Sequence, residues 1–427
     1  MGIDGLAARL LRHFNRQVLD FAESPTGTRL PSLNPDQSCL LYLHIPYCVV
    51  LCPFCSFHRV MFKKDSTEQY FESLRREIEI VTDAGFHFDE LYVGGGTPTV
   101  LPNELMNTIL FARERHTIEK TSVETNPDDL ANENVLALRD AGVNRLSVGV
   151  QSFDDTLLHE MQRFEKYGSG AEIRDRLRKT EGLFDTINVD MIFNFPHQTE
   201  AMLCRDLDIL IDDISVDQVS FYPLMTVGST RKKMSQTVGN VDYSREKGFY
   251  QIIADRMLTA GYVRSSAWCF SRARALIDEY IVDRDQYVGL GSGSFSYLQG
   301  SLFASTFSIN HYISLVANGT TGTVLRRRMT DREQKRYYLM MRLFGGTLDT
   351  LEAESRFNGR FCRSLAVELA ALHAYGAIKS SEEKIVLTER GYYLWVVMMR
   401  EFFTGVNSLR DQMRHNIAKE ARVLRAH

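Results

Sequence analysis

Six short runs rich in apolar and β-forming residues recur between Cys39 and Leu224, and charged stretches with helical periodicity separate them. Two of these stretches read STEQYFESLRREIEIVTDAG and NELMNTILFARERH. Strand alternating with helix predicts βαβ units around a parallel sheet, because each parallel strand needs a crossover that brings the chain back. The six runs are CLLYLHI, ELYVGGG, TSVETN, RLSVGV, TINVDMIF and QVSFYPL.

This alternation predicts an α/β core, either a barrel or a doubly wound sheet. In both folds functional side chains gather where the carboxyl ends of the parallel strands meet. Beyond about Gly300 the alternation stops, and residues 330–401 have the pattern of helices followed by a short hairpin. Helices with a small hairpin resemble a winged-helix module. The charge around this segment is mixed, so we expect no binding to nucleic acid.

The pattern divides the chain into five segments. Apolar residues at helical spacing before residue 22 predict an amphipathic N-terminal helix, and a loop rich in Pro, Gly, Ser and Asn follows it. We expect this helix and loop at 1–38, the α/β core at 39–300, a connecting segment at 301–330, a helical, winged C-terminal domain at 331–400 and a tail at 401–427.

Composition narrows the class of protein. Of 427 residues 44% are hydrophobic, and the net charge of −4 gives no reason to expect a polyanionic partner. Seven cysteines are too few for a disulfide framework. No apolar run approaches the roughly 18 residues of a membrane span, and the first residues lack the apolar core of a signal peptide. The sequence therefore predicts a cytoplasmic protein.

Three of the seven cysteines lie in one stretch, LHIPYCVVLCPFCSFHR, directly after a predicted strand. Cys48, Cys52 and Cys55 have the spacing Cys-x3-Cys-x2-Cys. A structural zinc site could add His44 or His58 as its fourth ligand, but zinc sites usually draw on two short pairs far apart in sequence. A loop with three thiolates suits a 4Fe-4S cluster in which one iron stays open to a substrate or cofactor.

This spacing resembles the signature of the radical S-adenosylmethionine (radical SAM) enzymes. The resemblance implies that the three cysteines ligate a 4Fe-4S cluster whose open iron chelates the amino and carboxylate groups of SAM. It implies that SAM is split to a 5′-deoxyadenosyl radical, with a flavodoxin or ferredoxin as the electron donor. It also implies a partial (β/α) barrel of the TIM type that carries the cofactors at the carboxyl ends of its strands.

Other polar motifs follow strand ends in the same layer. YVGGGTPT places three glycines after a strand, where the backbone can approach a ligand closely. Glu124 and Gln151 end two further strands, and Asp190 lies within an apolar strand, where an unpaired carboxylate would be costly. Such groups can converge on one ligand that has ribose hydroxyls and a carboxylate. Each could also make an ordinary buried hydrogen bond.

Longer motifs resemble the HemN-like subfamily, built around anaerobic coproporphyrinogen III oxidase, over roughly residues 38–320. They are GGGTPT, ETNPD, NRLSVGVQSFDD, LHEMQRF, DMIFNFPHQT and YVGLGSGSFSYL. The resemblance implies that Tyr42 contacts SAM near the cluster and that Gly94, Gly95, Gly96 and Thr97 meet its methionine amino group. It assigns the polar ends of SAM to Glu124 and Arg163, the ribose to Gln151 and Asp190, and the adenine to Phe54 and Phe221.

Two departures from these relatives guide the expected function. The porphyrin oxidase has a fourth cysteine two residues after the third, where this chain has Phe57. The haem-trafficking relatives have a His-Asn motif that is absent here before GLGSGSFSY. The resemblance therefore favours the class C radical SAM methyltransferases, which use two SAM molecules to methylate an sp2 carbon of a conjugated ring. CPFCSFHR and SAWCFS look most like the menaquinone methyltransferases.

Two alternatives stay open. One is anaerobic tetrapyrrole chemistry, either haem ring opening or decarboxylation of coproporphyrinogen III, and the other is a haem-binding or haem-delivery protein. Cys269 and Tyr280 are weak candidates for catalytic groups, because an ordinary core position is the commoner outcome for each. A prenylated quinone would bring the protein into transient contact with the inner membrane face, and the Met- and aromatic-rich YYLMMRLFGG and YYLWVVMMREFF are compatible with an apolar substrate.

Overall fold

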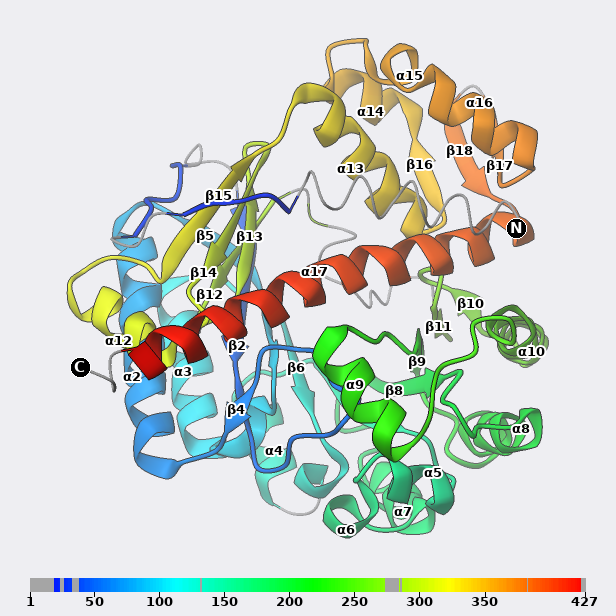
Figure 1. The fold of residues 1–427 in the computed structure, drawn as a ribbon, viewed down its shortest axis with the longest axis horizontal. Coiled ribbons are helices and arrows are strands. Elements are labelled where there is room, and N and C mark those ends of the chain that lie inside the picture. The colour runs from blue at the N-terminus through cyan, green and yellow to red at the C-terminus, as the bar shows by residue number, and fades with distance from the viewer. Residues whose placement is uncertain are drawn as a thin grey trace.

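The computed structural model describes residues 19–23, 27–32, 38–130, 133–272, 284, 286–381 and 383–423. An α/β core makes up most of the molecule, and a smaller helical domain with a long final helix lies beside it (Figure 1). All six predicted β-rich runs are strands of one sheet. The expected partial (β/α) barrel with a helical C-terminal domain is therefore confirmed.

The central part of the main sheet is parallel. Its strands lie in the order β12-β2-β5-β6-β7-β8-β9, and each pairs in parallel with its neighbours. Most of their residues are buried, as expected for strands that are covered on both faces. The strands are β2 (Ser38–Ile45), β5 (His87–Gly95), β6 (Lys120–Thr125), β7 (Arg145–Gln151), β8 (Thr186–Phe193), β9 (Gln218–Pro223) and β12 (Tyr287–Leu290).

Helices between consecutive strands cover the outside of the sheet (Figure 1). Several begin at a residue whose side chain accepts a backbone N–H of the first turn, among them Asp154, Ser169 and Thr199. The helices of the core are α2 (Lys64–Asp83), α3 (Pro102–Arg115), α4 (Glu133–Asp140), α5 (Asp155–Glu160), α6 (Phe164–Tyr167), α7 (Gly170–Arg178), α8 (Glu200–Asp208), α9 (Gly228–Thr237) and α10 (Glu246–Thr259), with single turns at Pro98–Val100, Pro127–Leu130 and Ile209–Asp213.

Antiparallel strands extend this sheet at both edges, which gives 13 strands within the described residues. The segment 301–330, which we expected to be a connection, contributes β14, α12 and β15 to the core. The domain boundaries themselves stay a prediction. The added elements are β1 (Ala22–Glu23), β10 (Val263–Arg264), β11 (Cys269–Ser271), β13 (Phe295–Leu298), β14 (Ser301–Ser305), α12 (Ile309–Ala317) and β15 (Thr323–Arg328).

The N-terminal helix was expected to reach residue 22. Residues 1–18 lie outside the described part of the chain. Ala22 and Glu23 are not helical and instead pair with Arg326 and Leu325 of β15 in an antiparallel ladder. The reason is that β15, beyond its pairing with β14, offers a row of backbone N–H and C=O groups that a neighbouring segment can satisfy.

The C-terminal domain packs helices against a small antiparallel sheet with the order β16-β18-β17. The indole N–H of the fully buried Trp395 donates to the carbonyl of Met340 at 2.9 Å. The Met- and aromatic-rich stretches of this domain are therefore mostly core packing. The elements are α13 (Asp331–Phe344), β16 (Thr347–Asp349), α14 (Thr350–Arg356), α15 (Phe361–Ser364), α16 (Ala366–Tyr375), β17 (Ile378–Ser380), β18 (Lys384–Leu387) and α17 (Glu389–Val423).

Helix α17 is 35 residues long and runs from the small domain across the core toward α2 and α12 (Figure 1). Buried Phe402 and Val406 give it an apolar face. The segment 401–427, which we expected to be a tail, is therefore helical as far as Val423, because this face packs on the core. Within the described residues no helix is both long and apolar enough to cross a membrane.

Candidate active site at the carboxyl ends of the parallel strands

The cysteine loop leaves the sheet directly after β2 and is tied together at its base. The two-residue strands β3 (Tyr47–Cys48) and β4 (Val60–Met61) close it by pairing in parallel. Cys48 and Cys52 are buried, Cys55 is half-buried, and none of them is in a disulfide. The three predicted cluster ligands therefore lie together in one loop at the barrel mouth.

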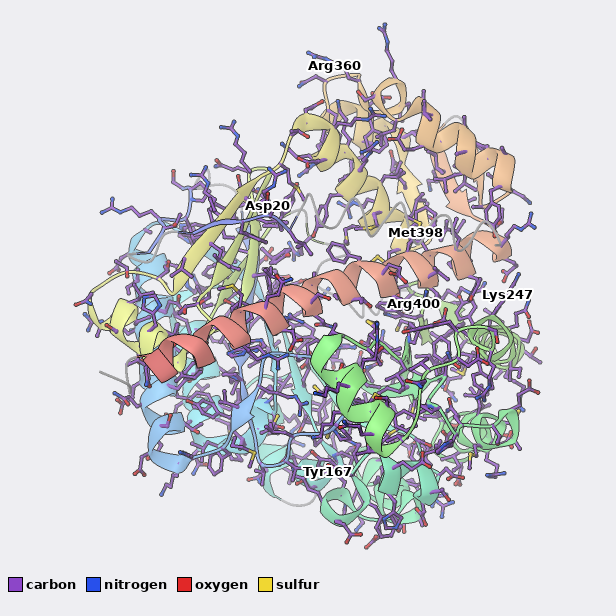
Figure 2. The ribbon with its side chains drawn as sticks, in the orientation of Figure 1. Asp20, Tyr167, Lys247, Arg360, Met398 and Arg400 are labelled. Atoms are coloured by element: carbon purple, nitrogen blue, oxygen red, sulfur yellow. The ribbon has the colours of Figure 1, made fainter. Side chains whose placement is uncertain are left out.

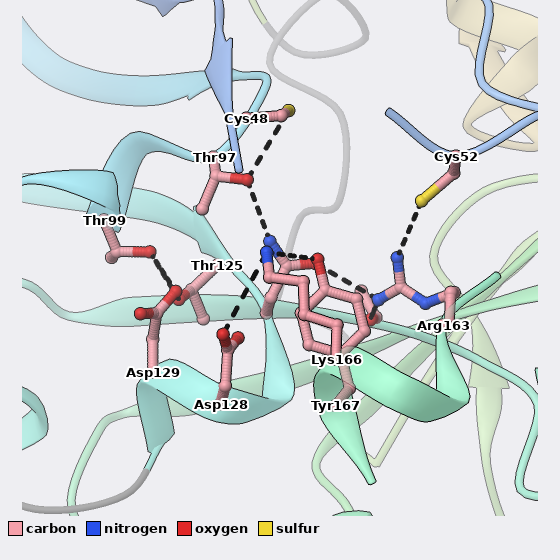
Figure 3. A network of polar contacts seen from close by, with 12 residues as sticks. Cys48, Cys52, Thr97, Thr99, Thr125, Asp128, Asp129, Arg163, Lys166 and Tyr167 are labelled. Atoms are coloured by element: carbon pink, nitrogen blue, oxygen red, sulfur yellow. Dashed lines mark hydrogen bonds and ion pairs between the residues drawn. The ribbon is translucent and has the colours of Figure 1, made fainter. Parts of the chain in front are cut away.

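A continuous chain of hydrogen bonds joins two of these sulfurs (Figure 3). The Thr97 hydroxyl donates to Cys48 Sγ at 3.6 Å and accepts from Asn126 Nδ2 at 3.0 Å. Arg163 donates from Nη2 to Asn126 Oδ1 at 3.1 Å and from Nη1 to Cys52 Sγ at 3.7 Å. Both sulfurs accept hydrogen bonds, which stabilise the thiolate form that a metal needs.

Arg59 holds the same loop from the other side. Its Nη2 donates to the carbonyl of Cys52 and to the carbonyl of Cys55, each at 2.6 Å. Its cationic group therefore fixes the backbone of two predicted ligands and adds positive charge beside their sulfurs. The sequence contains no local signal for this role, because an arginine after the third cysteine could equally face solvent.

The donor set fits a 4Fe-4S cluster. Burial raises the pKa of the Cys48 thiol to about 11, so this sulfur keeps its proton until a metal displaces it. No three His, Cys, Asp or Glu side chains in the described ranges are close enough to bind a single metal ion. In a four-iron cluster each cysteine binds a different iron, so its three sulfurs lie farther apart than around one zinc ion.

The glycine turn after β5 leaves no room for side chains. A Cβ atom at Gly96 would lie 2.9 Å from Cys48 Sγ, and one at Gly94 would lie 2.7 Å from Glu124 Oε1. Gly95 has φ of +127°, which L side chains rarely adopt. The turn therefore brings its backbone directly against the cysteine loop and the carboxylate of β6.

Two buried histidines beneath the loop have definite tautomers. His44 Nε2 lies 3.1 Å from the carbonyl of His58 and must donate to it, so Nδ1 accepts from the Tyr42 hydroxyl at 2.9 Å. Burial lowers the pKa of His44 to about 3, which keeps the ring neutral. The hydroxyl of Ser292 donates to the carbonyl of Thr306 at 2.8 Å, so it accepts from His58 Nε2 at 3.2 Å. Because His44 Nδ1 carries no proton, the hydroxyl proton of Tyr42 points at His44.

Glu124 lies at the end of β6 between two donors. It accepts from the N–H of Gly95 at 3.0 Å and from the Tyr92 hydroxyl at 3.1 Å. Burial raises its pKa, and these two hydrogen bonds oppose the rise. The structure therefore brings Glu124 together with the glycine turn, where the resemblance placed one end of SAM.

Asp190 and Cys269 belong to a polar row across β7, β8, β9 and β11. Asp190 accepts from the Ser147 hydroxyl at 3.0 Å and from Asn188 Nδ2 at 2.7 Å. The Ser220 hydroxyl donates to Asn188 Oδ1 at 3.1 Å and lies 3.7 Å from Cys269 Sγ. Cys269 is fully buried, so it is part of this hydrogen-bonded row and not an exposed thiol.

The remaining predicted residues lie in the core or outside the described part. Phe54 packs edge-on against Phe195 at 6.3 Å, and Phe221 packs against Phe270 at 6.1 Å. Tyr280 lies outside the described residues. The two phenylalanines are buried, and their predicted contact with adenine stays a prediction.

Gln151 ends β7 with φ of +77°, a left-handed conformation that is uncommon for a residue with a side chain. A buried carboxylate supports the two residues that follow it. Asp206 on α8 accepts from the Phe153 N–H at 2.8 Å and from the Ser152 hydroxyl at 2.8 Å. Asp206 therefore positions the turn that carries Gln151, and sequence reasoning missed it because it is distant in the chain.

We expect Asp206 to make the protein less stable as the pH rises from about 4 to about 7. Burial raises its pKa from 3.8 to about 7, so over this range the folded protein holds a proton that the unfolded chain releases. The free energy of unfolding should fall by up to about 1.4 kcal/mol per pH unit from this group. Asp206→Asn cannot ionise, yet its amide oxygen can still accept the Phe153 N–H.

Urea unfolding of both proteins across this range measures the effect. Asp154 and Arg205 are the charged groups that also act on Asp206, and both are present in both proteins. The wild type should lose stability relative to Asp206→Asn as the pH rises, and the two should converge at the acid end. A difference that stays constant with pH would show that Asp206 does not titrate in this window.

Comparison with known proteins finds similarity to one enzyme superfamily. The pattern described as the radical SAM superfamily matches residues 42–210. Over this segment the chain is similar to the radical SAM superfamily. Its cofactors are accordingly a 4Fe-4S cluster and SAM. The solved structure of the coproporphyrinogen III oxidase HemN from Escherichia coli, a radical SAM enzyme, has the same fold, with a TM-score of 0.75 over 90% of this chain and 95% of that chain at 21% identity.

Three curated relatives are HemN-like proteins of similar length. The heme chaperone HemW of Bacillus subtilis is 28% identical over 83% of this chain and 96% of its own. The anaerobilin synthase of Escherichia coli is 27% identical over 83% of this chain and 81% of its own. The oxygen-independent coproporphyrinogen III oxidase of Bradyrhizobium diazoefficiens is 24% identical over 86% of both chains.

These relatives contradict the expected function. The prediction of a class C methyltransferase acting on menaquinone was wrong. It rested on two missing features, the fourth cysteine and the His-Asn motif, and on short matches such as CPFCSFHR. Similarity over more than four-fifths of the chain instead connects it with proteins whose names refer to heme and coproporphyrinogen. A few local positions carry less information than an alignment of this length.

Proposed function

We propose that this chain is a radical SAM enzyme whose substrate is a tetrapyrrole. The observation that carries the proposal is the extended similarity to the heme chaperone HemW and to coproporphyrinogen III oxidase. Heme and coproporphyrinogen III are both tetrapyrroles. The absent fourth cysteine, replaced by Phe57, is compatible with a reaction on this substrate class that differs from that of the oxidase.

When bound, the 4Fe-4S cluster supplies the electron that cleaves SAM. Cys48, Cys52 and Cys55 would hold it, and hydrogen bonds from Thr97 and Arg163 would spread the negative charge of two of the sulfurs. Arg59 would keep the loop in shape through the two carbonyls that it binds.

The chain's own groups at the barrel mouth match a zwitterionic cofactor. Glu124 would accept from the amino group of SAM, beside the exposed backbone of the glycine turn. Because the proton of Tyr42 is directed at His44, its oxygen would accept rather than donate toward the cofactor. Helix α17 lies over the cysteine loop, since Arg414 donates to the carbonyl of Phe57 at 3.2 Å, and it would limit the access of water.

We further propose that a flavodoxin or ferredoxin is the electron donor and that the protein binds a second SAM molecule. A heme-delivery protein is the second candidate, and the similarity to HemW favours it. The two candidates differ in one respect that can be measured. An enzyme consumes SAM when the tetrapyrrole is present, whereas a delivery protein binds heme and returns it unchanged.

The test is an anaerobic incubation of the reconstituted protein with SAM, a strong reductant and either heme or coproporphyrinogen III, followed by mass spectrometry. We expect 5′-deoxyadenosine to form together with a modified tetrapyrrole. Stoichiometric heme binding without consumption of SAM would favour delivery. A protein that neither binds nor changes either tetrapyrrole would contradict the proposed function.

A further inference from the structure

Three arginines from two distant parts of the chain meet at the end of the cysteine loop. Arg59 belongs to the loop itself, whereas Arg410 and Arg414 lie on α17. Arg414 Nη1 donates to the carbonyl of Phe57 at 3.2 Å. The guanidinium carbon of Arg410 lies 5.2 Å from the centre of the Phe57 ring and 5.5 Å from that of Phe295. Helix α17 therefore brings two cations to Phe57, the residue that replaces the fourth cysteine: Arg410 lies near its ring, and Arg414 binds its carbonyl.

Positive charge is concentrated at this point. Burial, together with the charge of Arg59, lowers the pKa of Arg414, although Asp411, at 3.4 Å, and Cys55 oppose this shift. Arg414 has five N–H donors, and its bonds to Phe57 and Asp411 engage Nη1 and Nη2. Arg59 donates from Nη2 to two backbone carbonyls, which carry no formal charge and so do not neutralise its guanidinium group. An anion at this place would therefore reduce the repulsion between the arginines.

The field of Arg410 also reaches the inside of the barrel mouth. Burial raises the pKa of Tyr42, Tyr287 and Glu124 and lowers that of His44. The charge of Arg410 opposes the first three shifts and adds to the fourth, and these groups stand on three different strands. These strands are β2, β6 and β12. Arg410 is thus close both to the surface at Phe57 and to the predicted cofactor site.

Apolar surface adjoins these arginines. Val49, Phe57 and Met61 are 47%, 47% and 51% exposed, although all three belong to the short segment that carries the cysteines. Met61 pairs in register with Cys48, the residue before Val49, so both lie at the base of the loop that carries Phe57. Large exposed apolar side chains that gather in one place commonly mark a binding surface. A flat apolar ligand with acidic groups at its edge is complementary to this combination.

We propose that Arg410 and Arg414 bind the side-chain carboxylates of the substrate while its macrocycle lies against Phe57. This inference rests on the proposed function and narrows it to tetrapyrroles that carry free carboxylates. Guanidinium groups bind carboxylates through two parallel hydrogen bonds, and they also stack on aromatic rings. The same two arginines can therefore contact both the carboxylates and the macrocycle of the ligand. Because both arginines lie on α17, the small domain takes part in the choice of substrate.

The test compares heme with its dimethyl ester, which has the same iron and ring but no free carboxylates. Binding to the cluster-loaded protein is followed by the absorbance of the heme. We expect the wild type to bind heme at least about 10-fold more tightly than the ester. Arg410→Ala and Arg414→Ala should each weaken heme binding by about 10- to 100-fold and leave the affinity for the ester almost unchanged.

Two controls separate this effect from general damage. Arg360→Ala removes an exposed arginine of the small domain (Figure 2) and should change neither affinity. Arg414→Lys should keep part of the preference for the acid. Retained binding of the ester together with normal iron content shows that a variant is folded.

The outcomes distinguish the two proposals. If the wild type binds heme and the ester equally, or if the Arg410 and Arg414 variants keep the preference for heme, the carboxylate site is wrong and the proposed function stands. If the wild type binds neither compound, the tetrapyrrole function itself is contradicted.

Discussion

Replacing Cys52 by alanine is expected to abolish both iron loading and SAM cleavage. Cys52 is one of three cysteines on a single loop, and a 4Fe-4S cluster cannot spare one of three protein ligands when the fourth iron is open. The sulfur of Cys52 also accepts a hydrogen bond from Arg163. In Cys52→Ala the charged guanidinium group would face a methyl group instead. We expect iron to fall from about four atoms per chain to below about one, and 5′-deoxyadenosine to fall at least about 10³-fold.

Iron analysis, visible absorbance and electron paramagnetic resonance of the reduced protein measure the first effect, and mass spectrometry measures the second. Cys204→Ala is the matched control, because Cys204 is also free but lies on α8 away from the loop. The control should keep both its iron and its activity. Full iron loading in Cys52→Ala would show that another residue completes the site.

Replacing Glu246 by alanine is expected to lower the free energy of unfolding strongly. Glu246 on α10 is 0% exposed, and Arg400 on α17 donates to both of its oxygens. Figure 2 shows Arg400 on α17 beside the α10 region. Breaking such a pair from one side leaves a buried charge uncompensated, which typically costs about 3–5 kcal/mol. We expect the lower end for Glu246→Ala, because Glu401 still accepts from Arg400 at 3.0 Å.

Chemical unfolding followed by circular dichroism measures this loss. A double variant with leucine at both 246 and 400 removes both members of the buried pair and should recover part of the stability. The recovery should be incomplete, because the buried Glu401 then loses its hydrogen bond from Arg400. The control is Asp140→Ala, which removes a pair with Arg139 that is 2.8 Å long but exposed on both sides and should change the stability little. If Glu246→Ala is no less stable than that control, the pair does not hold α17 on the core.

Local patterns predicted the elements that depend on neighbouring residues. The apolar runs that became β2 and β5 to β9 needed only strand propensity and burial on both faces. The spacing of Cys48, Cys52 and Cys55 likewise indicated a cluster, because ligands on one loop are close in sequence and in space. Helices with a clear periodicity, such as α2 and α3, were predicted for the same reason.

Contacts between distant residues could not be predicted in this way. Asp206 supports the turn after Gln151 from another helix, and Arg410 reaches Phe57 from the far end of the chain. The segment 301–330 was expected to be a connection, but its strands β14 and β15 pair with each other and join the main sheet through β13. The substrate class was misjudged because a few local departures were weighed above the similarity of the whole chain.

The sequence by itself determined the α/β core and the cysteine loop, because these follow from periodicity and from ligands within a few residues of one another. SAM as a cofactor followed from the resemblance of the chain's motifs to a known family. Only the tertiary structure decided which side chains surround that loop. It brought Asn126 and Arg163 between the two sulfurs, closed Arg59 onto the loop and laid α17 with its arginines across the barrel mouth. These arrangements depend on the packing of the strands and helices, which joins residues that no local pattern connects.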